Sequence, residues 1–157
     1  MKIDILFFNE EFTNKEEFIS DSDLFNEYIN THLFDGKSKD ILLMPPSLSS
    51  RGNETILVAY EELNKRELMN LGYSIGKKIK QSSTIDILNF EGSKEILSLG
   101  IMFSTYKFDT YKTKKGKESV EINFSEEIKT ESSFLKREAV FWVRDMINTP
   151  PLDKTPE

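Results

Sequence analysis

Short apolar runs alternate along the chain with apolar stripes that have helical spacing. Runs rich in β-branched and aromatic residues predict strands over residues 2–8, 54–60 and 84–90. The run DILLMPP predicts a short buried strand that Pro45 and Pro46 stop. Helical spacing predicts helices over residues 22–34, 64–81 and 93–108, and a last helix that begins at Ser132 or Ser133 and ends before Pro150. Residues 118–125 alternate, which indicates a half-exposed strand or a sheet edge. Strands separated by helices predict an α/β fold, a mixed β-sheet with helices on both faces.

The segment 64–81 is the clearest helix. Asn64 is a good N-cap, and Glu67 stands three residues later, as in a capping box. Gly72 and Gly76 lie one turn apart. Either they let the backbone approach a neighbouring element closely, or the helix merely tolerates them.

Two other helices carry well-defined apolar stripes. In residues 22–34 the stripe includes His32, which predicts a packed, hydrogen-bonded core histidine rather than a catalytic one. In the last helix the apolar residues on one face are Leu135, Ala139, Trp142, Val143, Met146 and Ile147.

Composition excludes several classes of protein. The 157 residues fit one domain, with 38% hydrophobic and 31% charged residues. The absence of cysteine excludes disulfides and thiolate metal sites, and a single histidine excludes a two-histidine metal site within one chain. A net charge of −6 argues against a surface that binds nucleic acid as a whole. The N-terminus lacks the pattern of a signal peptide, and no apolar run reaches the length of a bilayer span.

Motifs for self-contained chemistry are not found. The seven glycines form no Gly-rich strand-to-helix turn, which excludes a dinucleotide fingerprint and a P-loop. Paired acids such as those in NEEF, KEEF, DSD, YEE and SEE fall in predicted loops and helix starts, where solvated carboxylates are common. We therefore assign no catalytic residue and no metal ligand to this chain.

A basic and aromatic segment, YKFDTYKTKKGK, follows the third predicted helix. Lysines interleaved with aromatic rings are typical of single-stranded nucleic-acid binding. The candidate contacts are Lys112, Lys114, Lys115 and Lys117. In an acidic chain we favour the simpler interpretation, an exposed loop near Gly116.

The segments YKFDTYKTKK and VRDMINTPPLDKTPE together resemble the leucyl aminopeptidase (cytosol aminopeptidase) family of metallopeptidases. In that family a helix ends in an Arg-Asp-Leu-Val-Asn-Thr-Pro-Pro segment that enters the catalytic domain. The matching positions are Arg144, Asp145, Asn148, Thr149, Pro150, Pro151, Thr155 and Pro156. Leu152, Asp153 and Lys154 depart from the pattern, because many members carry a polar residue directly after the two prolines.

The resemblance implies a domain division and a macro-domain-like form of the α/β fold. Residues 1–148 would be the amino-terminal, non-catalytic domain, and residues 149–157 a proline-rich joint toward a catalytic domain that the chain does not contain. Two prolines fix φ and remove backbone donors, which suits a stiff spacer between two folded bodies. The joint residues are Arg144, Asn148, Pro150 and Pro151.

The same resemblance predicts what the parent protein does. It would be a cytoplasmic homo-hexamer that removes amino-terminal residues from peptides with two divalent metal ions, zinc or manganese. The ligands of those ions lie downstream of this chain, so this chain alone is expected to be inactive. Its domain would serve assembly, access to the active site or contact with partners. The alternative is a nucleotide- or nucleic-acid-binding module that uses the basic segment, since some bacterial members of the family bind DNA. A weaker possibility is a small free-standing enzyme built on clustered carboxylates.

Overall fold

A mixed β-sheet lies at the centre of the structure, a computed structural model that describes residues 1–8, 17–36, 39–109, 111, 120–125 and 131–150. Within these residues the strands follow one another across the sheet in the order β2 (Ile41–Met44), β3 (Glu54–Ala59), β1 (Lys2–Phe8), β4 (Ser83–Leu88) and β5 (Ile122–Phe124). The pairs that join β3, β1, β4 and β5 are parallel, and β2 runs antiparallel to β3. The predicted edge strand is confirmed, because β5 ends the sheet.

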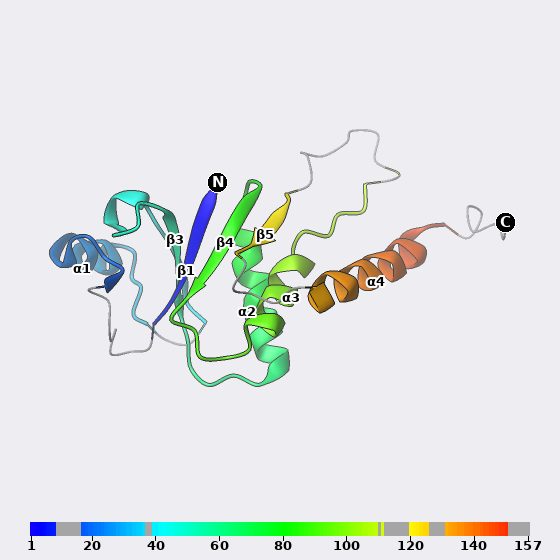
Figure 1. Cartoon of the computed structure of the whole chain (residues 1–157), viewed down its shortest axis with the longest axis horizontal. Helices are drawn as coiled ribbons and strands as arrows, with labels where there is room; N and C mark the ends of the chain where they lie inside the picture. Colours follow the sequence, from blue (N-terminus) through cyan, green and yellow to red (C-terminus); the bar gives the residue numbers. More distant parts are fainter. Residues whose placement is uncertain (9–16, 37–38, 110, 112–119, 126–130, 151–157) are drawn as a thin grey trace.

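Helices cover both faces of the sheet, as predicted (Figure 1). The helices of the described chain are α1 (Ser22–Thr31), the 3-10 helix η2 (Pro46–Leu48), α2 (Lys65–Lys78), α3 (Lys94–Phe103) and α4 (Glu131–Asn148). Of these, none is both long enough and apolar enough to cross a membrane.

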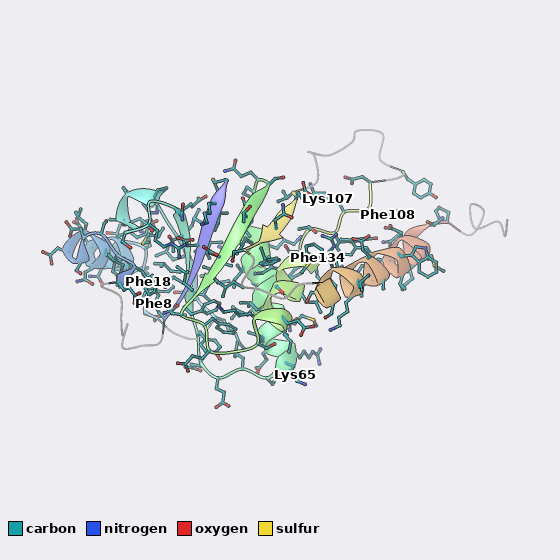
Figure 2. All side chains as sticks on the ribbon, viewed as in Figure 1. Phe8, Phe18, Lys65, Lys107, Phe108 and Phe134 are labelled. Atoms are coloured by element: carbon teal, nitrogen blue, oxygen red, sulfur yellow. The ribbon has the colours of Figure 1, made fainter. Side chains whose placement is uncertain are left out.

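Alternating residues of β1 supply two separate cores. Ile3, Ile5 and Phe7 pack toward α2 and α3, while Leu6 and Phe8 pack toward α1. Figure 2 shows Phe8 on the α1 side of the sheet. A strand that is buried on both faces reads as a nearly continuous apolar run, and this is why β1 and β3 were recognisable in the sequence.

Local sequence signals set the ends of two elements. Pro45 follows β2 directly and lacks the backbone donor that a further ladder bond would need. At the start of α2 the Asn64 side chain accepts hydrogen bonds from the backbone of Arg66 and Glu67, and the Glu67 carboxylate accepts one from the Asn64 backbone. The predicted capping box is therefore present.

Helices α2 and α3 cross at glycines. A β-carbon at Gly72 would overlap the carbonyl oxygen of Leu97, and one at Gly100 would overlap the carbonyl oxygen of Met69. Gly76 likewise faces Ser104 and the carbonyl oxygen of Ile101. Of the two interpretations left open for Gly72 and Gly76, the structure supports close backbone approach.

A charged network lies on the α1 side of the sheet, near the amino ends of the parallel strands. Asp4 of β1 is fully buried and stands beside Asp86 of β4 in the strand register. Arg51 joins the two carboxylates: its Nε lies 3.3 Å from Oδ2 of Asp4, and its Nη2 lies 2.7 Å from Oδ2 of Asp86. Asn53 also donates a hydrogen bond to Oδ2 of Asp4, over 3.0 Å. Arg51 therefore supplies the positive charge that a buried carboxylate requires.

The environments of the two carboxylates differ. Oδ1 of Asp4 has no hydrogen-bond partner within the described part of the chain. Asp86 keeps some contact with solvent, and a hydrogen bond from Ser125 together with the charges of Lys2 and Arg51 lowers its pKa. The network thus ties β1 and β4 together through one side chain, that of Arg51, which lies in the loop before β3.

Candidate functional site

The candidate functional site is α4, because it carries two of the four joint residues named from the sequence, Arg144 and Asn148. It packs on α3 and extends away from the sheet (Figure 1). Phe134, Arg137, Phe141 and Arg144 are half-buried and recur every three or four residues, so they form the side of α4 that faces the domain. Phe134 lies where the start of α4 meets the rest of the domain (Figure 2). The guanidinium of Arg137 stands 5.0 Å from the ring centroid of Phe134 and 5.8 Å from that of Phe141, within the range of cation–π attraction.

The first turn of α4 is held by Glu95 of α3. The Ser132 hydroxyl donates a short hydrogen bond to the Glu95 carboxylate, and Lys136 Nζ lies 2.9 Å from the same oxygen. Ser133 is fully buried and donates to the backbone carbonyl of Glu95 over 3.3 Å. The hydrogen bond from Ser132, followed by the hydrogen bond and charge of Lys136, lowers the pKa of Glu95.

The last turns of α4 are held by Tyr106, which follows α3. The Tyr106 hydroxyl donates to Oδ1 of Asp145 over 3.0 Å and accepts from Nδ2 of Asn148 over 2.9 Å. The guanidinium of Arg144 lies 5.1 Å from the centroid of the Tyr106 ring and 5.8 Å from that of Phe103. Loss of solvation, and to a smaller extent the neighbouring Asp145 carboxylate, raises the pKa of Tyr106. The Tyr106 clamp, as we call these contacts, fixes the direction in which the chain leaves α4.

The structure therefore brings together two of the four predicted joint residues, Arg144 and Asn148. Pro150 is exposed at the end of the described chain, and Pro151 lies outside it. Sequence reasoning missed the role of Tyr106. Both segments that form the clamp had been recognised from the family resemblance, but nothing in either segment showed that they touch.

Replacing Tyr106 with phenylalanine should loosen the carboxyl-terminal end of α4. The change keeps the ring and removes the hydroxyl that bonds Asp145 and Asn148, so we expect a small loss in the free energy of unfolding that is confined to this end of the helix. Hydrogen exchange should speed up in the last turn of α4 and stay unchanged at Ser132. Tyr73→Phe, on the exposed surface of α2, is the matched control. Equal exchange in both variants would show that the clamp does not hold the helix.

The opposite face of α4 is apolar and exposed. Its side chains are the ones that the sequence pattern placed on a single face, but among the described residues this face has no packing partner in the domain. We call it the α4 stripe. It consists of Leu135, Ala139, Trp142, Val143, Met146 and Ile147.

A groove of about 720 Å3 separates the inner side of α4 from β5. Tyr106, Phe134 and Phe141 contribute rings to it, and charged side chains of both signs are mixed among them. Within the described residues no group of three or more histidine, aspartate or glutamate side chains could hold a metal ion. The donor set that two divalent ions would need is therefore not found in this part of the chain, and we derive no catalytic step here.

Aromatic rings fill the carboxyl-terminal edge of the parallel strands, where open α/β sheets commonly bind nucleotides. The Phe7 ring packs against Tyr60 and Phe90, with centroids 5.8 Å and 4.4 Å away. Asn89 uses its side-chain amide to bond both the backbone N–H and the carbonyl of Phe7, over 3.0 Å and 2.7 Å. The described residues at this edge therefore favour packing over ligand binding.

The nucleic-acid alternative gains no support. Its candidate contacts Lys112, Lys114, Lys115 and Lys117 lie outside the described residues. Of the paired acids, Asp21 serves as the N-cap of α1, accepting from the backbone of Asp23 and Leu24, which is the structural role expected for it.

The prediction that His32 belongs to the core is wrong. Helix α1 ends at Thr31, and His32 is an exposed cap residue that stacks on Tyr28, with its Nδ1 2.9 Å from the Tyr28 carbonyl oxygen. Its hydrogen bonding was expected, but its exposure was not. Phe25 and Ile29 carry the buried face of the helix instead.

Comparison with known proteins places the chain beside aminopeptidases. No family model matches it. A curated relative, a probable cytosol aminopeptidase from Wolinella succinogenes, is 27% identical over 173 aligned residues, which cover 98% of this chain and 33% of the relative. The chain therefore spans about a third of the length of the curated relative that it matches.

Solved structures show that this fold occurs in aminopeptidases. The cytosol aminopeptidase of Coxiella burnetii matches with a TM-score of 0.63 and 16% identity, over 98% of this chain and 32% of that one. The bottromycin maturation enzyme BotP matches with a TM-score of 0.65 and 13% identity, over 99% and 34%. A tomato leucine aminopeptidase variant matches with a TM-score of 0.59 and 13% identity, over 94% and 35%.

Proposed function

We propose that this chain, which is homologous to the amino-terminal domain of the leucyl aminopeptidase (cytosol aminopeptidase) family, is the non-catalytic domain of a longer aminopeptidase. The parent protein would hydrolyse amino-terminal residues from peptides in the cytoplasm. Two divalent metal ions, zinc or manganese, would supply the Lewis acid and the activated water of that reaction when bound to the parent's own ligands.

The observation that carries this proposal is the coverage of the matches. Sequence and fold similarity extend over 98% of this chain but only about a third of each aminopeptidase. The remaining two-thirds of those proteins has no counterpart here. The peptidase chemistry would then belong to that part, and this chain would support it.

The way in which α4 is held supports a structural role. Glu95 fixes the first turn of the helix, and the Tyr106 clamp fixes its last turns. A joint of this kind would set the orientation of a following domain. Residues 1–148 would form the domain and residues 149–157 the joint, and the parent would assemble as a homo-hexamer in which this domain serves assembly, active-site access or partner contact.

Hydrolysis of leucyl-amide substrates tests the proposal. With zinc or manganese added, the 157-residue chain should show only background turnover, whereas the full-length product of the gene should be active. A mock purification from cells without the gene measures contaminating aminopeptidase. Turnover by the 157-residue chain above this background, or an inactive full-length protein loaded with either metal, would contradict the proposed function.

A further inference from the structure

The α4 stripe is a continuous apolar surface. Leu135, Trp142 and Ile147 are 74%, 65% and 71% exposed, and Val143 and Met146 are about half exposed. Single exposed apolar side chains are ordinary, but a run of them along one helix face marks an interaction site. The set includes Trp142, and tryptophan is among the residues that most often anchor an interface.

The stripe is also presented in a fixed orientation. Contacts at Glu95 and at Tyr106 hold the two ends of α4 against the domain, and the rings of Phe134 and Phe141 pack beneath its middle. A surface that is already ordered loses little conformational entropy on binding. Burial of these side chains would therefore translate efficiently into affinity.

We propose that the α4 stripe docks onto the domain that follows it in the parent aminopeptidase, in an apolar hollow that receives the Trp142 indole. This inference rests on the proposed function, because it requires a longer chain. Its partner is identified by position: α4 is the last described element, the matched aminopeptidases are about three times as long as this chain, and the stripe lies directly before the joint.

A short tether favours this partner over any other. A domain joined a few residues beyond Asn148 would meet the stripe at an effective concentration of about millimolar, so even a modest apolar contact would stay closed. A second copy of the chain could pair with the same stripe as two packed helices. It would have to do so without the advantage of the tether.

Hydrogen exchange in the full-length protein tests the docking. We expect amides of residues 139–147 to exchange about tenfold or more slowly in the full-length protein than in the 157-residue chain, because docking removes the outer face of α4 from water. The double variant Trp142→Ser with Ile147→Ser should abolish this difference. Leu24→Ser removes a similarly exposed apolar side chain from α1 and should leave it intact.

Two further measurements separate the alternatives. As 157-residue chains, both variants should have the same circular dichroism spectrum as the unsubstituted chain, because the changed side chains are exposed. An effect in the full-length protein would then come from docking. Sedimentation of the 157-residue chain should show a monomer. A dimer of the 157-residue chain that the substitutions Trp142→Ser and Ile147→Ser abolish would overturn the proposal in favour of a second copy. Equal hydrogen exchange in the long and short chains would also overturn it. Slow exchange in an inactive full-length protein would leave the docking in place and reject the proposed function alone.

Discussion

Replacing Arg51 with methionine should lower the free energy of unfolding by about 3 kcal/mol, because removing one partner of a buried ion pair leaves an uncompensated charge. Asp4 is fully buried, and Arg51 is the cation within 4 Å of its carboxylate in the described chain. Asn53 remains as a neutral donor and reduces the loss only in part. Urea denaturation of the two chains measures the difference.

Two variants identify the cause of that loss. Lys2→Met removes the other cation near Asp86. The Lys2 side chain is half exposed, so its loss should lower the free energy of unfolding by no more than about 1 kcal/mol. Asp4→Asn in the Arg51→Met background removes the stranded charge and should restore part of the stability. If the losses of stability in Arg51→Met and Asp4→Asn simply add up in the double variant, the charge pairing is not what Arg51 contributes.

Replacing Gly100 with alanine should destabilise the protein by about 2 kcal/mol, although the same change in an open helix would stabilise it by about 1 kcal/mol. The new methyl group would overlap the carbonyl oxygen of Met69 in α2, and neither backbone can move without separating the two helices. The sign of the effect is therefore diagnostic of the close crossing.

Ser74→Ala on the exposed side of α2 serves as the control for helix propensity. It should leave stability unchanged or raise it slightly, because alanine is the better helix former. Thermal unfolding of Gly100→Ala, Ser74→Ala and the unsubstituted chain compares their stabilities. A stabilised Gly100→Ala variant would mean that α2 and α3 lie farther apart than the structure shows.

The sequence predicted the strands of the sheet well, because β1 and β3, buried on both faces, leave a nearly continuous apolar run and β4 leaves an alternating one. Residues 54–60 and 84–90 were found as strands, and β3 and β4 occupy almost the same positions. Helix ends were less predictable. The predicted helix over residues 93–108 stops at Phe103, where the hydroxyls of Ser104 and Thr105 bond the carbonyls of Ile101 and Met102. Such local hydroxyl bonds compete with the helix and do not alter hydrophobic periodicity.

The orientation of α4 could not be predicted from periodicity, because the hydrophobic pattern marks the wrong side. The domain-facing side consists of aromatic rings and arginines, which pack by cation–π contacts. A hydropathy pattern counts the arginines as polar and therefore does not mark this side as buried. Of the clamp residues, the sequence identified Arg144 and Asn148, and only as members of the joint. Their partner Tyr106 lies about forty residues away along the chain, and only the folded structure brings it to them.

The position of β1 has a consequence for synthesis on the ribosome. This strand precedes both of its partners, β3 and β4, along the chain, yet it lies between them in the sheet. Until Leu88 has left the exit tunnel, Ile5, Leu6 and Phe7 cannot be fully buried, and the nascent chain carries an apolar, unpaired strand. Ribosome-associated chaperones that shield emerging apolar segments should therefore engage β1 until β4 has been made.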